Sequence, residues 1–247
     1  SGKVYMVRAG LFDDVDVALH WHPGSNNDAD AGAALANKSA KFRFHGISAH
    51  AAAAPERGRS ALDGVEAMNY MVNMMREHIP QETRIHYVIT QGGKAPNVVP
   101  DFAEVYYYAR HNNRKVVMEV FDRIVKAAEG AALGTGTTMD YEMIGGTHEL
   151  LPNIALQQVM HKNLQKVGGV SYTQEETAFA DKISQSLGRG HLKTEEVGKI
   201  EPFSEVGQPM GSTDVGDVSF AVPTAGLGVA TWVPGTPAHS WQAVAAG

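Results

Sequence analysis

The sequence predicts an α/β protein built from two domains, one of which is inserted into the other. Its length of 247 residues suits one large domain or two smaller ones. Helical and strand-like apolar patterns alternate along the chain, and the middle part has them in the order βαββαβ, which is typical of ferredoxin-like domains. We therefore expect an inserted domain at residues 38–150 and an outer α/β domain made of residues 1–37 and 151–247.

The elements of the middle part are visible as periodic apolar residues. Alternation predicts strands at residues 40–45, 84–90, 103–110 and 137–144. Steps of three and four predict two helices, with buried sides formed by Ala61, Val65, Met68, Val72, Met75 and Ile79 in the first and by Val117, Val120, Phe121, Ile124 and Ala128 in the second. Ser60 and Asp63 resemble a capping box before the first helix, and Pro80 ends it.

The outer segments are less regular. Residues 15–20 are apolar and partly β-branched, and they predict a buried strand that ends in turn-forming residues at 22–27. Beyond Pro152 we expect a helix at residues 154–167, a partly helical surface stretch at 173–199, and a strand within 225–232 that leads into a loop with His239. Loops at strand ends are where α/β proteins place their ligands.

Composition excludes several classes of function. Lys plus Arg number 21 against 27 Asp plus Glu, and a net charge of -6 disfavours binding to nucleic acid. No apolar run approaches the ~20 residues that cross a bilayer, and the first residues lack a signal-peptide pattern, so we expect a cytoplasmic protein without membrane contact. Cysteine is absent and eleven histidines are present, so any strong metal site would use His, Asp and Glu.

Four histidines stand at predicted strand ends or in loops. His20 and His22 would share a face if the strand continues to His22, and both could then bind one cation; otherwise they are ordinary loop histidines. His50 follows a strand and either donates to a developing oxyanion or hydrogen-bonds its own turn. His239 follows the stiff Pro234–Pro237 turn and is either a distant ligand or one more loop histidine.

Three further polar residues have two interpretations each. Asn97 and Arg110 flank the third predicted strand of the middle domain, and a guanidinium with a nearby amide suits a substrate carboxylate. Alternatively, Arg110 pairs with a surface acid. Asp214 is either an acid that supports a site from behind or a turn residue.

Taken together, these segments resemble the dinuclear-metal aminoacylase and carboxypeptidase family of amidohydrolases. The resemblance lies in the order of its blocks, which are Gly2-Lys3-Val4-Tyr5-Met6, Leu19-His20 with Pro23, Gly46 with His50 and Pro55, Gly92-Gly93 with Asn97-Val98-Val99-Pro100, Arg110, and Ala238-His239. Leu19-His20-Trp21-His22-Pro23 and the residues from Pro237 to Gln242 look most like the p-aminobenzoyl-glutamate hydrolase branch.

The resemblance implies an enzyme that hydrolyses the amide bond of an N-acyl amino acid with two divalent ions, zinc or manganese. Its α/β catalytic domain would be interrupted by a ferredoxin-like lid and dimerisation domain, in a homodimer or a heterodimer with a related subunit. His20, or His22 in a shifted alignment, and His239 would be metal ligands. His50 would face the substrate carbonyl, often across the dimer, and Asn97 and Arg110 would hold the carboxylate.

The family's His-x-Asp motif, bridging Asp and paired glutamates precede the block that begins here at Gly2. We therefore expect this chain to be an inactive fragment of a longer enzyme, in which an upstream Glu deprotonates the metal-bound water. The alternatives are a non-catalytic dimerisation or interaction subunit and a carboxylate-binding module.

Overall fold

The computed structural model describes residues 1–29, 34–190, 194–207 and 211–246. The chain divides into two compact units, each described here by itself. The first unit comprises residues 1–5, 34–149 and 210–217, and the second comprises residues 6–33, 150–209 and 218–247.

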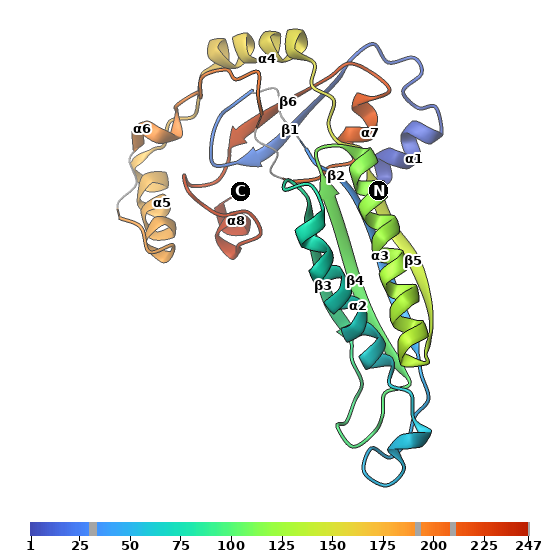
Figure 1. The fold of residues 1–247 in the computed structure, drawn as a ribbon. Coiled ribbons are helices and arrows are strands. Elements are labelled where there is room, and N and C mark those ends of the chain that lie inside the picture. Colours follow the sequence, from blue (N-terminus) through green and yellow to red (C-terminus); the bar gives the residue numbers. More distant parts are fainter. Residues whose placement is uncertain (30–33, 191–193, 208–210, 247) are drawn as a thin grey trace. The chain divides into compact units, whose positions relative to one another are not determined.

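The first unit is built on one antiparallel sheet with the strand order β3-β4-β2-β5. Its strands are β2 (Ala36–His45), β3 (Arg84–Gln91), β4 (Phe102–His111) and β5 (Thr138–Thr147). Helix α2 (Ala61–Met75) lies between β2 and β3 in the chain, and α3 (Arg114–Thr135) lies between β4 and β5, so the predicted βαββαβ order is confirmed. Figure 1 shows α2 and α3 side by side on one face of this sheet.

The core of the first unit lies between the sheet and these two helices. The apolar residues predicted for α3 are all buried, as are those predicted for α2 apart from Ile79. The aromatic rings of Phe42 and Tyr107 meet edge to face with centroids 5.8 Å apart. The helix therefore forms where the apolar period of the sequence matches its buried side.

Helix α2 is shorter than the apolar pattern predicted. The hydroxyl of Ser60 accepts a hydrogen bond from the amide of Asp63 at 3.1 Å, which confirms the expected N-terminal cap. The α-helix ends at Met75 and a 3-10 turn, η2 (Arg76–His78), follows. Pro80 stops the chain from continuing, but the last turn before it has already tightened.

The other face of the sheet is polar, with the carboxylate of Glu104 among its cations. Glu104 accepts hydrogen bonds from Lys41 Nζ at 3.0 Å, Arg43 Nε at 2.9 Å and Thr90 Oγ1 at 2.8 Å. Burial alone would raise the pKa of Glu104, but the bonds from Thr90, Arg43 and Lys41 outweigh it and hold that pKa below its usual value.

The second unit contains a two-stranded parallel sheet of β1 (Ala18–Gly24) and β6 (Thr224–Ala230). Helix α4 (Ile154–Val167) packs near β6, and Gln157 exchanges two hydrogen bonds with the backbone of Gly226. Helices α5 (Gln174–Ser186) and α8 (Trp241–Ala246) border a small core of Ala180, Ile183 and Val233. The predicted helix at 154–167 and the predicted helical content of 173–199 are confirmed.

The prediction of a buried strand at residues 15–20 was wrong in two respects. The strand begins at Ala18 and continues through His22 and Pro23 to Gly24, and its apolar side chains Leu19 and Trp21 are 64% and 62% exposed. Among the described residues β1 pairs only with β6, so its second edge carries no hydrogen-bonded strand. Proline is tolerated on such an edge because its missing N–H breaks no ladder bond.

Five short elements complete the described chain. They are α1 (Gly2–Arg8), η1 (Pro55–Arg57), α6 (Thr194–Val197), α7 (Val215–Ser219) and the 3-10 turn η2. Helix α1 has no buried residue, so no apolar period marked it in the sequence. Within the described parts of the chain, no helix combines the length and the apolar character that a membrane crossing requires.

Candidate functional site

Two of the candidate metal ligands lie on strand β1. His20 lies opposite Gly226 of β6, and its ring packs so closely that a Cβ on this glycine would lie 2.4 Å from Nε2. The Nδ1 atom of His22 lies 2.7 Å from the carbonyl oxygen of Pro23. A carbonyl only accepts, so Nδ1 of the neutral ring holds the proton and Nε2 keeps its lone pair. Such a bond commonly orients a histidine that binds metal through its other nitrogen.

His239 lies in a turn that is fastened to the carboxyl end of the same strand. The amide of Trp232 donates to the carbonyl of Gly24 at 3.0 Å, and Ser25 Oγ donates to the carbonyl of Thr236 at 3.2 Å. His239 has a φ of 61°, the one positive value among the described non-glycine residues. A side chain in that region is held there by its surroundings, and such positions cluster at functional sites.

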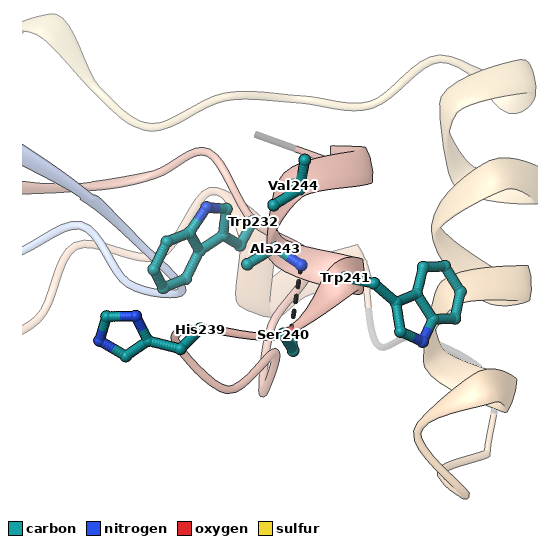
Figure 2. Close-up of a pocket in the computed structure, with 6 residues that line it drawn as sticks. All are labelled: Trp232, His239, Ser240, Trp241, Ala243 and Val244. Carbon is teal, nitrogen blue, oxygen red and sulfur yellow. Dashed lines mark hydrogen bonds between the residues drawn. The ribbon is translucent and has the colours of Figure 1, made fainter. Parts of the chain in front are cut away.

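The side chain of His239 borders an open pocket of about 530 Å³, a size in the range of small-molecule sites. Figure 2 shows the His239 ring on the same side of the turn as the indole of Trp232, while Trp241 points away from both. The structure thus brings His239 to the end of β1 that carries His22, although the two are far apart in the sequence.

These histidines fit a zinc or manganese ion as part of a ligand set. Imidazole nitrogen is a ligand for both metals, and Nε2 of His22 has the required lone pair. Across the described ranges, however, no three His, Asp or Glu side chains gather closely enough to hold an ion. The remaining ligands of a two-metal centre are therefore not grouped with these histidines in the described residues.

In the first unit, His50 and Asn97 lie on two loops that pair with each other. His50 forms a β-bridge with Val98, and the amide of Ala51 donates to the carbonyl of Asn97 at 3.0 Å. The amides of Ala52 and Ala53 both donate to Nδ1 of His50 at 3.2 Å. A neutral His50 therefore holds its proton on Nε2. The bond to the turn and a role as donor, which the sequence posed as alternatives, are compatible.

Arg110 lies near the other end of the sheet. Strand β4 begins at Phe102, next to the loops of His50 and Asn97, and Arg110 follows roughly 26 Å further along at about 3.3 Å per residue. Figure 1 shows both loops beyond the same end of the sheet. Within one chain the structure does not bring Asn97 and Arg110 together around one ligand.

The guanidinium of Arg110 makes no ion pair with an acid among the described residues. Its Nε is buried without a hydrogen-bond partner, and its Cζ lies 5.1 Å from the ring centre of Tyr108. The expected alternative, a surface ion pair, is not found here. A buried donor of this kind is suited to an anion.

Asp214 forms an ion pair with Lys3, with 2.9 Å between Nζ and the carboxylate. Burial raises the pKa of Asp214, but the hydrogen bonds from Lys3 outweigh this and lower it. The structure thus assigns Asp214 a partner within its own unit.

Sequence reasoning overlooked Gly226 and Arg84. A glycine inside a strand indicates a close approach of another group, so Gly226 could have been suspected from its position in β6. Arg84 lies opposite Arg110, and only the strand register shows this.

Comparisons with known proteins agree on one family. A family model described as the peptidase dimerisation domain, M20_dimer, matches residues 36–135. One of the subunits of the p-aminobenzoyl-glutamate hydrolase of Escherichia coli (strain K12) is 39% identical over all of this chain and 56% of its own length. The Xaa-Arg dipeptidase of Homo sapiens is 28% identical over 90% of this chain and 45% of its own.

Among solved structures, an aminobenzoyl-glutamate utilization protein from Klebsiella pneumoniae has a TM-score of 0.62 at 22% identity, covering 98% of this chain and 55% of that one. At this identity the match concerns the fold. The chain spans about half the length of the curated relatives that it matches.

Proposed function

Through its dimerisation domain the chain belongs to the M20 peptidase family, and we propose that it contributes histidine ligands and a substrate grip to a metal-dependent amidohydrolase. The proposed reaction is hydrolysis of the amide bond of an N-acyl amino acid with an aminobenzoyl-type acyl group, such as p-aminobenzoyl-glutamate. The 39% identity to a hydrolase of that name supports this substrate class. The assignment of residues 1–37 and 151–247 to one catalytic domain stays a prediction.

The observation that carries the proposal is the meeting of His22 and the His239 turn at the carboxyl end of β1. Carboxyl ends of parallel strands are the usual ligand sites of α/β sheets. His20 or His22, together with His239, would supply imidazole nitrogens to two zinc or manganese ions. When bound, such ions acidify water and polarise a carbonyl.

The residues of the first unit would act on the substrate directly. His50 would donate its Nε2 proton as a hydrogen bond to the carbonyl oxygen, where negative charge develops during attack. Arg110 would bind the carboxylate of the amino acid, and Asn97 would add an amide hydrogen bond. Because Arg110 lies at the opposite end of the sheet from His50 and Asn97, one substrate that meets all three requires two copies of this domain.

We propose that the two copies pair through the edge strand β3 and the neighbouring helix α2. Both carry exposed apolar side chains, which are Tyr87, Val88 and Ile89 on β3 and Tyr70 and Met74 on α2. Antiparallel pairing about Val88 would place Arg84 of one copy opposite Gly92 of the other, so no like charges would meet. It would also bring the loop that follows β3, with Asn97, towards the Arg110 end of the second copy.

The other edge strand, β5, is less suited to pairing with a copy of itself. It carries two acids, Asp140 and Glu142, and no basic residue. Two copies would bring four carboxylates together. The pairing could equally involve a related but different chain, because the 39% identical relative is itself named as one of the subunits of its hydrolase.

The test is hydrolysis of p-aminobenzoyl-glutamate by the full-length, metal-loaded protein and its His50→Ala variant. We expect turnover to fall by about 10²–10³, the usual effect of losing one oxyanion donor, with metal content unchanged. His78→Ala, an exposed histidine on η2, is the matched control and should leave turnover unchanged.

An unchanged rate in His50→Ala would refute its role. If the full-length protein retains no divalent metal after dialysis against zinc or manganese and hydrolyses no N-acyl amino acid, the enzyme proposal fails. The chain would then be a non-catalytic dimerisation subunit or a carboxylate-binding module.

A further inference from the structure

The polar face of the first unit's sheet carries a row of four side chains at one end. Arg84 of β3 is the register partner of Arg110 of β4, and Asn37 of β2 pairs with both Arg110 and Thr147 of β5. Side chains directly opposite in antiparallel strands start about 4.5–5.5 Å apart. All four strands thus contribute to one polar row, in which two arginines are neighbours.

The two arginines have no acidic partner within the described residues. No ion pair joins a carboxylate to Arg84 or Arg110 there. The acids of this face are instead bonded to Lys41 and Arg43, further along the sheet. Like charges directly opposite each other destabilise a sheet, so this arrangement favours an anion between them.

Donors in the row remain for such an anion. Nη1 of Arg84 donates to the carbonyls of Gln81 at 2.8 Å and Thr83 at 3.0 Å, which fixes the guanidinium and leaves its Nε and Nη2. Nε of Arg110 and Oγ1 of Thr147 are buried without hydrogen-bond partners. Buried polar atoms normally have partners, so these two point to a bound ligand.

The positive charge of the row belongs to the arginines. His86 lies two residues beyond Arg84, on the same side of β3. Burial lowers the pKa of His86, and the charges of Arg110, Arg76 and Arg84 lower it further. His86 is therefore neutral near pH 7, and the anion would meet two fixed guanidinium charges.

We propose that Arg84 and Arg110 together bind a dicarboxylic amino acid, with the α-carboxylate on Arg110 and the side-chain carboxylate on Arg84. The substrate class is then N-acyl-glutamate or N-acyl-aspartate, and Arg84 determines this specificity. The inference rests on the proposed function for the role of Arg110. It goes beyond that function in naming the second cation and its selectivity.

The test compares binding of free L-glutamate and L-glutamine to the full-length protein by titration calorimetry. We expect glutamate to bind about 10- to 100-fold more tightly, the range for one additional charge-assisted hydrogen bond. Arg84→Gln should abolish this ratio by weakening glutamate alone, and Arg84→Lys should restore part of it. Arg43→Gln is the matched control, because this arginine lies on the same face but is already paired with Glu104 and Glu142.

Equal affinity of the wild type for both amino acids, no binding of either, or an unchanged ratio in Arg84→Gln would overturn the inference. Thermal unfolding checks that each variant is folded. Hydrolysis separates the two proposals. If no N-acyl amino acid is hydrolysed but the binding ratio depends on Arg84, only the proposed function fails. If glutamate and glutamine derivatives are hydrolysed equally well, only this inference fails.

Discussion

Replacement of Gly226 by alanine tests whether His20 or His22 binds metal. A Cβ at position 226 would lie 2.4 Å from Nε2 and Cε1 of His20, whereas ordinary contact begins near 3.4 Å. The imidazole must therefore move by about 1 Å. Overpacking of this kind costs about 1–3 kcal/mol, so we expect a loss of stability of that size in urea unfolding.

The same shift has a second, sharper consequence. Metal–ligand distances tolerate only about 0.2 Å, so a 1 Å movement would remove His20 from a metal. If His20 is a ligand, metal content of the full-length Gly226→Ala variant after dialysis should fall together with stability. If His22 is the ligand, stability should fall while metal content stays close to that of the wild type.

Gly24→Ala is the matched control on the same sheet, because its nearest neighbour would be the carbonyl oxygen of Val229 at 3.9 Å. This variant should keep both metal and stability. The reasoning would be refuted if Gly226→Ala were as stable as the wild type and Gly24→Ala, since the His20 ring would then not depend on the missing Cβ.

Three further predictions concern the fold and its assembly. Because the folded pKa of Glu104 is depressed, its stabilising effect is complete above about pH 4.5 and is lost as the pH falls through the lower folded value; Glu104→Gln should flatten the loss of urea stability below that pH, and parallel curves would contradict this. Val88→Lys on β3 should weaken the dimer at least about tenfold in analytical ultracentrifugation, whereas Ile144→Lys on β5 should not, and the reverse would assign the interface to β5. Thr173→Ala removes the hydroxyl that caps α5 and should lower the local stability of that helix by about 1 kcal/mol, measured as faster amide exchange than in the wild type.

The sequence alone determined the elements of the first unit. The periods of α3 and of β2 to β5 were readable because each element has one buried face, and burial imposes a strict spacing of apolar residues. The ordered motif blocks also indicated the family. Strand β1 was misjudged because its exposed Leu19 and Trp21 resemble buried residues in composition, and composition does not reveal how many strands lie alongside.

Only the tertiary structure decided which candidate residues meet. It tied the His239 turn to the end of β1, through hydrogen bonds between segments that are distant in sequence. It separated Arg110 from His50 and Asn97, because antiparallel register places them at opposite ends of one strand. It also set Arg84 beside Arg110. Register depends on the pairing of whole strands, so neither neighbour relation is encoded near the residues themselves.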